Sequence, residues 1–224
     1  LDNCTNSGKI TGVICGGIVG RVKYFGVQFQ NCTNTAIINR ISSATSALCG
    51  GILGDAYQNT SDDAFVNCIN TGDLTGDQYN AGGIVGRVYD KNKNSNSSSV
   101  FYGCINSGTI EGKSKAGIAG ANAENAIFER CRNYGTIKGN GNGIADTFNT
   151  MKDCFDFRAD NSKLTNTNNT TVIDSYYNKG LLADTAVKNI LTWIYGERSI
   201  GSADAKKAEV NPNNMAGYPA VYYK

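Results

Sequence analysis

The chain has 224 residues, with 27 glycines, 8 cysteines and only 2 prolines, and its net charge is +2. So small a charge does not favour nucleic-acid binding or attraction to an anionic membrane. The chain has no histidine, which excludes histidine-based acid–base catalysis, Ser-His and Cys-His nucleophiles, and histidine-ligated metals. It also lacks a run of about 18 apolar residues, so we expect no membrane insertion.

A repeated unit organises most of the chain. It is aligned on a cysteine that has a large apolar residue three positions before it and an asparagine two positions after it. The unit recurs about every 23 to 36 residues, which indicates a repeat architecture. The clearest members are Phe29, Phe65, Phe101 and Phe128 at the apolar position, Cys32, Cys68, Cys104 and Cys131 at the cysteine position, and Asn34, Asn70, Asn106 and Asn133 at the asparagine position. A second block, such as Gly82-Gly83-Ile84-Val85-Gly86, completes each unit.

Each unit contains three short apolar runs separated by Gly or Asn, which are too short for helices. The shortest units cannot hold the four strands of a propeller blade. The pattern therefore predicts an all-β fold, a three-sided parallel β-helix of about six or seven coils over residues 1–175. Equivalent residues of successive coils would lie above one another as Phe, Cys and Asn ladders. Glycines would supply positive φ at the corners or allow close backbone approach.

The composition changes near the C-terminus. Residues 184–196 begin with a plausible cap, end in Gly, and have apolar residues at 187, 190, 191 and 194 that fit one helix face. An open coil end would expose strand edges and core, so we expect residues 176–224 to form a small C-terminal cap with one short helix.

The motif Cys-x-Asn-x-Gly-x-Ile-x-Gly, followed by Gly-Gly-Ile-Val-Gly, resembles the GLUG-motif repeats of bacterial secreted and surface proteins over residues 1 to about 146. The ending is similar too, in Ser175-Tyr176-Tyr177, Trp193 and the tail from Asn213 to Pro219. The second unit departs from the motif, with Ala36 and Arg40 at glycine positions. The resemblance implies a right-handed parallel β-helix, secreted or on the cell surface, without established catalytic residues.

Tyrosines are the main candidates for ligand binding. Tyr57, Tyr79, Tyr89 and Tyr102 fall at variable positions in consecutive units, where we expect them to point outward. Flat rings along an elongated face suit stacking on glycans. Arg21 and Arg87 follow the glycine block in two non-adjacent units, where a solvated face is expected.

Carboxylates are the only candidate catalytic groups. Asp153, Asp156 and Asp160 cluster near Lys152 and Arg158, in a pattern that acid–base chemistry or calcium could use. Asp156, however, occupies the asparagine column, so corner or solvated roles are expected for these residues. We predict no catalytic residue, no metal site and no cofactor.

The cysteines at the repeat position are expected to be inert core thiols. Cys15 and Cys49 differ, because each precedes a glycine block in adjacent units at a spacing within disulfide range. Side chains in register point alongside each other rather than at each other, so a bond between the two is left open.

We therefore expect a non-catalytic extracellular module, secreted or at the cell surface, that acts in adhesion or as a rigid spacer. Its expected partners are glycans or host surface proteins, and other domains of the same polypeptide, but not nucleic acid. Leu1 falls inside a repeat and no signal-peptide pattern is present, so we expect a piece of a longer protein. The alternative is a polysaccharide lyase or glycoside hydrolase on a β-helix scaffold.

Overall fold

The structure, a computed structural model, describes most of the repeat region. The described residues are 1–24, 26–41, 47–57, 63–76, 80–89, 98–157, 171–173 and 176–177, the last two ranges by their backbone alone. Regular structure in these ranges consists of β-strands, and none of the described residues is helical. The predicted cap helix at 184–196 lies outside the described residues.

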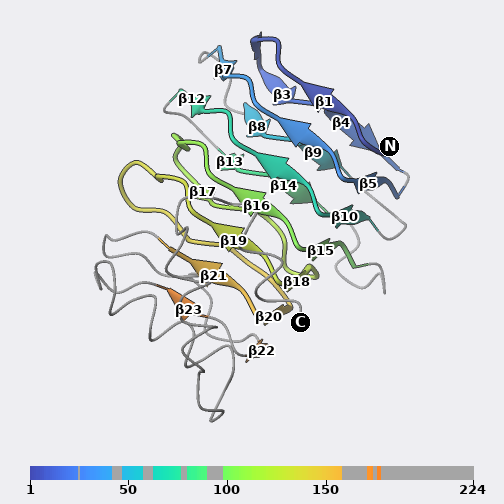
Figure 1. The fold of residues 1–224 in the computed structure, drawn as a ribbon, viewed down its shortest axis with the longest axis vertical. Coiled ribbons are helices and arrows are strands. Elements are labelled where there is room, and N and C mark those ends of the chain that lie inside the picture. Colours follow the sequence, from blue (N-terminus) through green and yellow to red (C-terminus); the bar gives the residue numbers. More distant parts are fainter. Residues whose placement is uncertain are drawn as a thin grey trace, which may run out of the picture. The chain divides into compact units, whose positions relative to one another are not determined.

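The strands form five sheets in which every strand pair is parallel. Each sheet takes one strand from each of several successive repeats, so neighbouring strands lie one repeat apart in the sequence. Figure 1 shows this succession, for example in β16, β19 and β21. The fold is therefore all-β with parallel sheets, an arrangement compatible with a parallel β-helix.

The two largest sheets carry the cysteine half of the repeat. The seven-stranded sheet contains β1 (Thr5–Asn6), β6 (Thr33–Asn34), β11 (Ile69–Asn70), β16 (Ile105–Asn106), β19 (Arg132–Asn133), β21 (Phe155–Asp156) and β23 (Tyr176–Tyr177). The six-stranded sheet contains β5 (Gln28–Gln30), β10 (Ala64–Val66), β15 (Val100–Tyr102), β18 (Ile127–Glu129), β20 (Thr150–Lys152) and β22 (Thr171–Ile173). Tyr176 and Tyr177, at the start of the predicted cap, thus belong to a repeat sheet.

Three smaller sheets carry the glycine half of the repeat. One contains β2 (Ile10–Gly12), β7 (Ile38–Arg40) and β12 (Leu74–Thr75). The second contains β3 (Ile14–Gly16), β8 (Leu48–Gly50), β13 (Asn80–Gly82) and β17 (Lys115–Ala116). The third contains β4 (Val19–Lys23), β9 (Leu53–Tyr57) and β14 (Val85–Tyr89).

A repeat contains more strands than the three apolar runs predict. The unit around Phe65 contributes five short strands, from β10 to β14, one to each sheet. The chain turns between β10 and β11 at Asn67, which has a left-handed φ of 51°. It turns again between β13 and β14 at the Gly83 position. Local turns therefore divide stretches that the sequence pattern shows as continuous.

The phenylalanines form a buried stack inside the repeats. Phe29, Phe65, Phe101 and Phe128 are register partners on four neighbouring strands, and all four are fully buried. Successive ring centres lie 5.3, 4.7 and 4.6 Å apart, with nearly parallel planes. Met151 continues the column in the next repeat. Aromatic burial of this kind is the largest contribution that one repeat position makes to the core.

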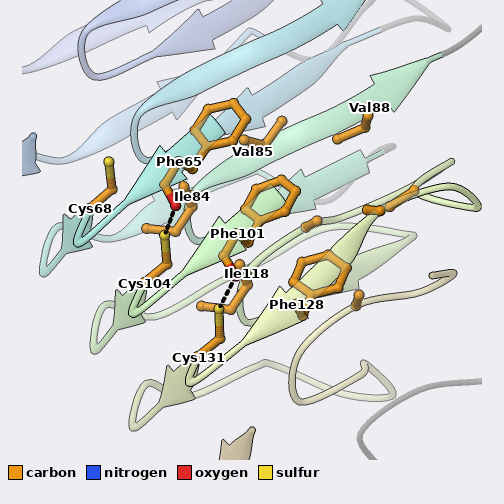
Figure 2. Close-up of a cluster of buried hydrophobic side chains, with 14 of the residues drawn as sticks. Phe65, Cys68, Ile84, Val85, Val88, Phe101, Cys104, Ile118, Phe128 and Cys131 are labelled. Carbon is orange, nitrogen blue, oxygen red and sulfur yellow. Dashed lines mark hydrogen bonds between the residues drawn. The ribbon is translucent and has the colours of Figure 1, made fainter. Parts of the chain in front are cut away.

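Beside the phenylalanines lies a column of buried thiols (Figure 2). Cys104 donates through Sγ to the carbonyl of Phe65 at 3.2 Å, and Cys131 donates to the carbonyl of Phe101 at 3.5 Å. Burial raises the pKa of Cys104 and of Cys154 well above its usual value. Hydrogen bonds with neighbouring thiols lower the pKa of Cys68 and, against the effect of burial, that of Cys131. All of these thiols are fully buried, so the column packs the core.

The asparagines form a continuous amide ladder. Asn34, Asn70, Asn106 and Asn133 are fully buried. Each donates through Nδ2 to the Oδ1 of the side chain at the same position in the next repeat, at 2.8 to 2.9 Å. The last of these acceptors is the carboxylate of Asp156. The ladder satisfies polar groups inside the core that would otherwise be costly to bury.

Candidate functional site

The outer side of the β4–β9–β14 sheet carries charged and aromatic side chains that the repeat does not conserve. Val22, Ala56 and Val88 are register partners that pack on the core cluster. Side chains alternate across a strand, so the residues on either side of these three point the other way. We name them the β4–β9–β14 face: Arg21, Lys23, Asp55, Tyr57, Arg87 and Tyr89.

One carboxylate holds two arginines together on this face. Asp55 pairs in register with Arg21 on one side and Arg87 on the other. Arg21 donates through Nε to Oδ2 at 2.8 Å, while Arg87 donates through Nε to Oδ1 and through Nη2 to Oδ2, both at 2.9 Å. The Asp55 side chain is 0% exposed, whereas Arg21 is 41% and Arg87 19% exposed. The negative charge is therefore enclosed and the positive charge faces solvent.

Two stacked tyrosines lie next to this ion network. The rings of Tyr57 and Tyr89 have centres 5.4 Å apart and an interplanar angle of 17°. The guanidinium carbon of Arg21 lies 5.2 Å from the centre of the Tyr57 ring, and that of Arg87 lies 5.2 Å from the centre of the Tyr89 ring. The ammonium of Lys23 is 5.7 Å from the Tyr57 ring. These cation–π contacts hold the aromatic and cationic groups in one surface.

The charged and aromatic residues of this face come from three successive repeats, and the next repeat lacks them. The segment Gly120-Ala121-Asn122-Ala123 corresponds in sequence to Gly86-Arg87-Val88-Tyr89. Val85 is bridged to Ala119, and the amide of Val88 donates to the carbonyl of Ala121. Ala121 and Ala123 are both buried. Arginine and tyrosine at these positions are therefore not required by the repeat, unlike the Phe and Asn columns.

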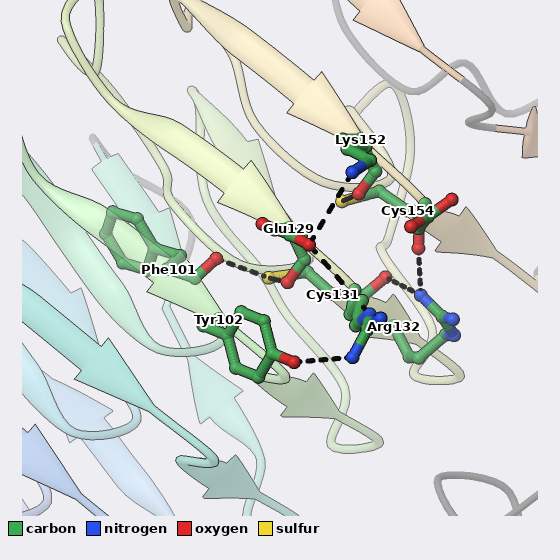
Figure 3. A network of polar contacts seen from close by, with 9 residues as sticks. Phe101, Tyr102, Glu129, Cys131, Arg132, Lys152 and Cys154 are labelled. Carbon is green, nitrogen blue, oxygen red and sulfur yellow. Dashed lines mark hydrogen bonds and ion pairs between the residues drawn. The ribbon is translucent and has the colours of Figure 1, made fainter. Parts of the chain in front are cut away.

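Of the four candidate tyrosines, the structure brings Tyr57 and Tyr89 together. Tyr79 lies outside the described residues. Tyr102 lies in the six-stranded sheet, in register with Val66 and Glu129. Its hydroxyl accepts a hydrogen bond from Arg130 at 2.5 Å, and Lys152 lies 4.0 Å from Glu129 (Figure 3). Tyr102 thus belongs to a separate polar cluster and not to the β4–β9–β14 face.

Asp55 is the residue that the sequence analysis missed. Arg21 and Arg87 were expected to be solvated residues of non-adjacent repeats. The repeat between them places an aspartate at the same position, directly after Gly54. Aligning the three glycine blocks and extending them by one residue would have given the order Arg, Asp, Arg. That order of alternating charge across neighbouring parallel strands is the signal for an ion network.

Two of the three carboxylates considered for catalysis, Asp153 and Asp156, lie in the described structure and have structural positions. Asp156 is fully buried and accepts the hydrogen bond of Asn133. Asp153 has a left-handed φ of 51° at the turn between β20 and β21. Asp160 and Arg158 lie outside the described residues. Within the described ranges, no three Cys, Asp or Glu side chains are grouped so that they could bind a metal ion.

Cys15 and Cys49 are register partners on β3 and β8, and both are free thiols. A hydrogen bond between the two thiols, followed by burial, raises the pKa of Cys49. The same hydrogen bond lowers the pKa of Cys15, against an opposing effect of burial. The two thiols therefore interact directly without forming a disulfide.

Comparison of the chain with protein-family models, with curated proteins and with solved structures gave no match. Among the residues that the structure describes, there is no helix with the length and hydropathy that crossing a membrane requires.

Proposed function

We propose that the chain is a non-catalytic module of a bacterial surface or secreted protein, which binds a glycan through the β4–β9–β14 face. The observation that carries this proposal is the set of cationic and aromatic side chains on that face. They occupy positions that the next repeat fills with buried alanines. Residues fixed by the repeat hold the fold together, so side chains that depart from it are the candidates for binding.

The finer architecture that we propose is a right-handed, three-sided parallel β-helix. Its support is the parallel pairing in all five sheets and the in-register columns of Phe, Cys and Asn. The similarity of the motif to GLUG-motif repeats supports an extracellular location. Thiols such as Cys104, with burial that raises the pKa, would resist oxidation in such a location.

Tyr89 is the ring best suited to contact a sugar. One side of it stacks on Tyr57, whose ring is further contacted by Arg21, Lys23 and Arg87. The next repeat has Ala123 at the sequence position that corresponds to Tyr89. Aromatic rings with one polar edge are well suited to binding a molecule that has both apolar and hydroxyl-bearing surfaces.

Binding is favoured over catalysis because of how the described carboxylates are used. Polysaccharide cleavage by a pair of acidic residues requires both to face the substrate. Asp55 is enclosed by two arginines, and Asp156 is enclosed in the amide ladder. A lyase or hydrolase therefore remains the alternative and is tested by the same experiment. If no glycan binds in that experiment, a host surface protein as ligand and a spacer role are the remaining alternatives.

The experiment is affinity electrophoresis of the chain in gels that contain soluble polysaccharides or mucin, with a reducing-sugar assay in parallel. We expect retardation without release of reducing ends. Tyr89→Ala should abolish the retardation, and Tyr102→Ala should retain it, since Tyr102 lies in another sheet. Circular dichroism checks that both variants are folded. Migration unaffected by any of the glycans would contradict glycan binding, and release of new sugar ends would favour the enzyme.

A further inference from the structure

The β4–β9–β14 face is positively charged, although the chain as a whole carries a net charge of only +2. The face carries three cations and one carboxylate: Arg21 and Arg87 enclose Asp55, and Lys23 lies over the Tyr57 ring. Both oxygens of Asp55 point at the guanidiniums, and its side chain does not reach solvent. A ligand that approaches from solvent therefore meets guanidinium and ammonium groups and not the carboxylate.

The arginines retain unused hydrogen-bonding capacity. Arg21 binds Asp55 through Nε alone, so within the described part of the chain its two terminal nitrogens make no hydrogen bond. Arg87 uses Nε and Nη2 on Asp55, which leaves Nη1. Asp55 thus fixes the orientation of both planar groups while their remaining N–H donors stay available. A guanidinium fork held in this way matches the geometry of a carboxylate or sulfate group.

The spacing of the two arginines bears on the size of the ligand. Arg21 and Arg87 lie on β4 and β14, with β9 between them. Two strand spacings put their backbones about 10 Å apart. Their guanidinium groups converge on the carboxylate of Asp55, which already occupies the position between them. The remaining N–H donors, with Lys23 on the same face, therefore offer several cationic contacts, which suit a chain with repeated acidic groups. The tyrosine pair lies alongside and offers ring surface to the uncharged part of such a chain.

We propose that the ligand of this face is an acidic polysaccharide, recognised through carboxylate or sulfate groups by Arg21, Lys23 and Arg87. This inference rests on the proposed glycan binding and specifies its ligand class. Nucleic acid fits less well, because the surfaces that bind it are extensively basic. Here the cations are few, and the net charge of the chain is only +2.

The test compares four polymers in affinity electrophoresis with the whole chain at low and high salt. They are polygalacturonate for carboxylate groups, heparin for sulfate groups, dextran as a neutral glycan, and single-stranded DNA. Binding to polygalacturonate or heparin that exceeds binding to dextran and weakens with salt is expected. The acidic polymer that binds more tightly identifies whether the face prefers carboxylate or sulfate groups.

Two variants locate the binding. Arg21→Gln keeps the bidentate Asp55–Arg87 pair and should weaken binding to the acidic polymer by about tenfold, the loss of one charge-assisted contact. Lys23→Gln removes an exposed cation whose described side-chain contacts are with tyrosine rings, and should also weaken binding. It replaces Arg21→Gln as the test if that variant fails to fold. Lys9→Gln, which removes an exposed cation of the first repeat outside this face, is the matched control and should bind as the wild type does.

The outcomes separate this inference from the proposed function. Equal binding to dextran and to the acidic polymers, unchanged in Arg21→Gln, would overturn the acidic ligand and leave glycan binding in place. Absence of binding to all three glycans would overturn both. Tighter binding to DNA that is lost in Arg21→Gln would assign the face to nucleic acid and overturn the inference.

Discussion

Asn70 donates a hydrogen bond from Nδ2 to Oδ1 of Asn106, across 2.8 Å between neighbouring repeats. The same Nδ2 donates its second hydrogen to the carbonyl of Gly72, and Oδ1 of Asn70 accepts from Asn34. Each inner member of the ladder must therefore accept a hydrogen bond from one repeat and donate one to the next. An amide does both, and a carboxylate can only accept.

This two-way requirement predicts that Asn106→Asp destabilises the fold. The carboxylate could still accept from Asn70, but it could no longer donate to Asn133 or to the carbonyl of Gly108. A buried charge with two acceptors facing it should lower the free energy of unfolding by at least about 3 kcal/mol. Urea denaturation at neutral pH measures the change.

Asp156→Asn is the matched control for the ladder. Asp156 accepts from Asn133, and an amide oxygen at that position can accept the same bond. We expect this variant to lie within about 1 kcal/mol of the wild type. A loss for Asn106→Asp no larger than that for Asp156→Asn would show that the direction of the hydrogen bonds is not what the ladder requires.

Gly83→Ala tests the close approach of the glycine blocks. A Cβ at Gly83 would lie 2.1 Å from the carbonyl oxygen of Gly117 and 2.6 Å from Cβ of Asn106. Backbone of the next repeat cannot yield without breaking the parallel pairing, so we expect a loss of at least about 3 kcal/mol. Gly8→Ala is the control, because its nearest contact would be 3.8 Å from Oδ1 of Asn6. Equal thermal midpoints for the two variants would contradict this account.

Phe101→Ala tests the aromatic column. The Phe101 ring is stacked between Phe65 at 4.7 Å and Phe128 at 4.6 Å, and the side chain is fully buried. Removing it leaves a cavity that neighbouring repeats cannot fill, so the expected loss of unfolding free energy is about 3–5 kcal/mol. Ile37→Ala, at an exposed position, should change stability by less than about 0.5 kcal/mol in the same denaturation experiment. Similar losses at both positions would place Phe101 outside the core.

Much of the strand register could be predicted from the sequence. In parallel strands related by one repeat, residues at equivalent positions become neighbours, so fixed residues such as Phe65 and Phe101 identify pairs without knowledge of the loops.

The turns were harder to predict from the sequence than the register. We expected glycines either to adopt the left-handed conformation or to allow close backbone approach. The glycine blocks do the second, and the recurrent left-handed position is the residue just before the cysteine. It is occupied by Asn3, Asn31, Asn67, Gly103, Arg130 and Asp153. Asparagine tolerates this conformation, but the arginine at the same position gives no such signal.

The candidate site was only partly predictable for a related reason. Position in the repeat shows which residues share a column, as for Tyr57 and Tyr89, but it does not show how side chains lean toward one another. The enclosure of Asp55 by Arg21 and Arg87 depends on the orientation of three flexible groups. Tyr102 occupies a variable outward position in the sequence as well, yet it lies in a different sheet. The stacking of Tyr57 on Tyr89, and the separation of Tyr102 from them, could therefore be established only from the structure.

Glu111 makes stability depend on acidic pH. Its Oε1 is paired with Lys138, and its Oε2 accepts from the amide of Gly76 at 3.0 Å. The hydrogen bond from Lys138, and then that from Gly76, holds the pKa of Glu111 below its usual 4.5. The folded state therefore binds this proton less readily than the unfolded state. The stabilisation is complete above the unfolded pKa and is lost as pH falls from about 4.5 through the lower folded pKa.

Glu111→Gln should remove this dependence. At neutral pH the wild type should be more stable than the variant by about 0.5–1 kcal/mol, since the pair is partly exposed. The difference should shrink as the pH of the urea titrations is lowered below 4.5. Glu124→Gln, which removes an exposed carboxylate, corrects for the change in net charge. A difference between Glu111→Gln and the wild type that stays constant from neutral to acidic pH would mean that the carboxylate is not stabilised by Lys138 and Gly76. The advantage of Glu111 would then come from packing alone.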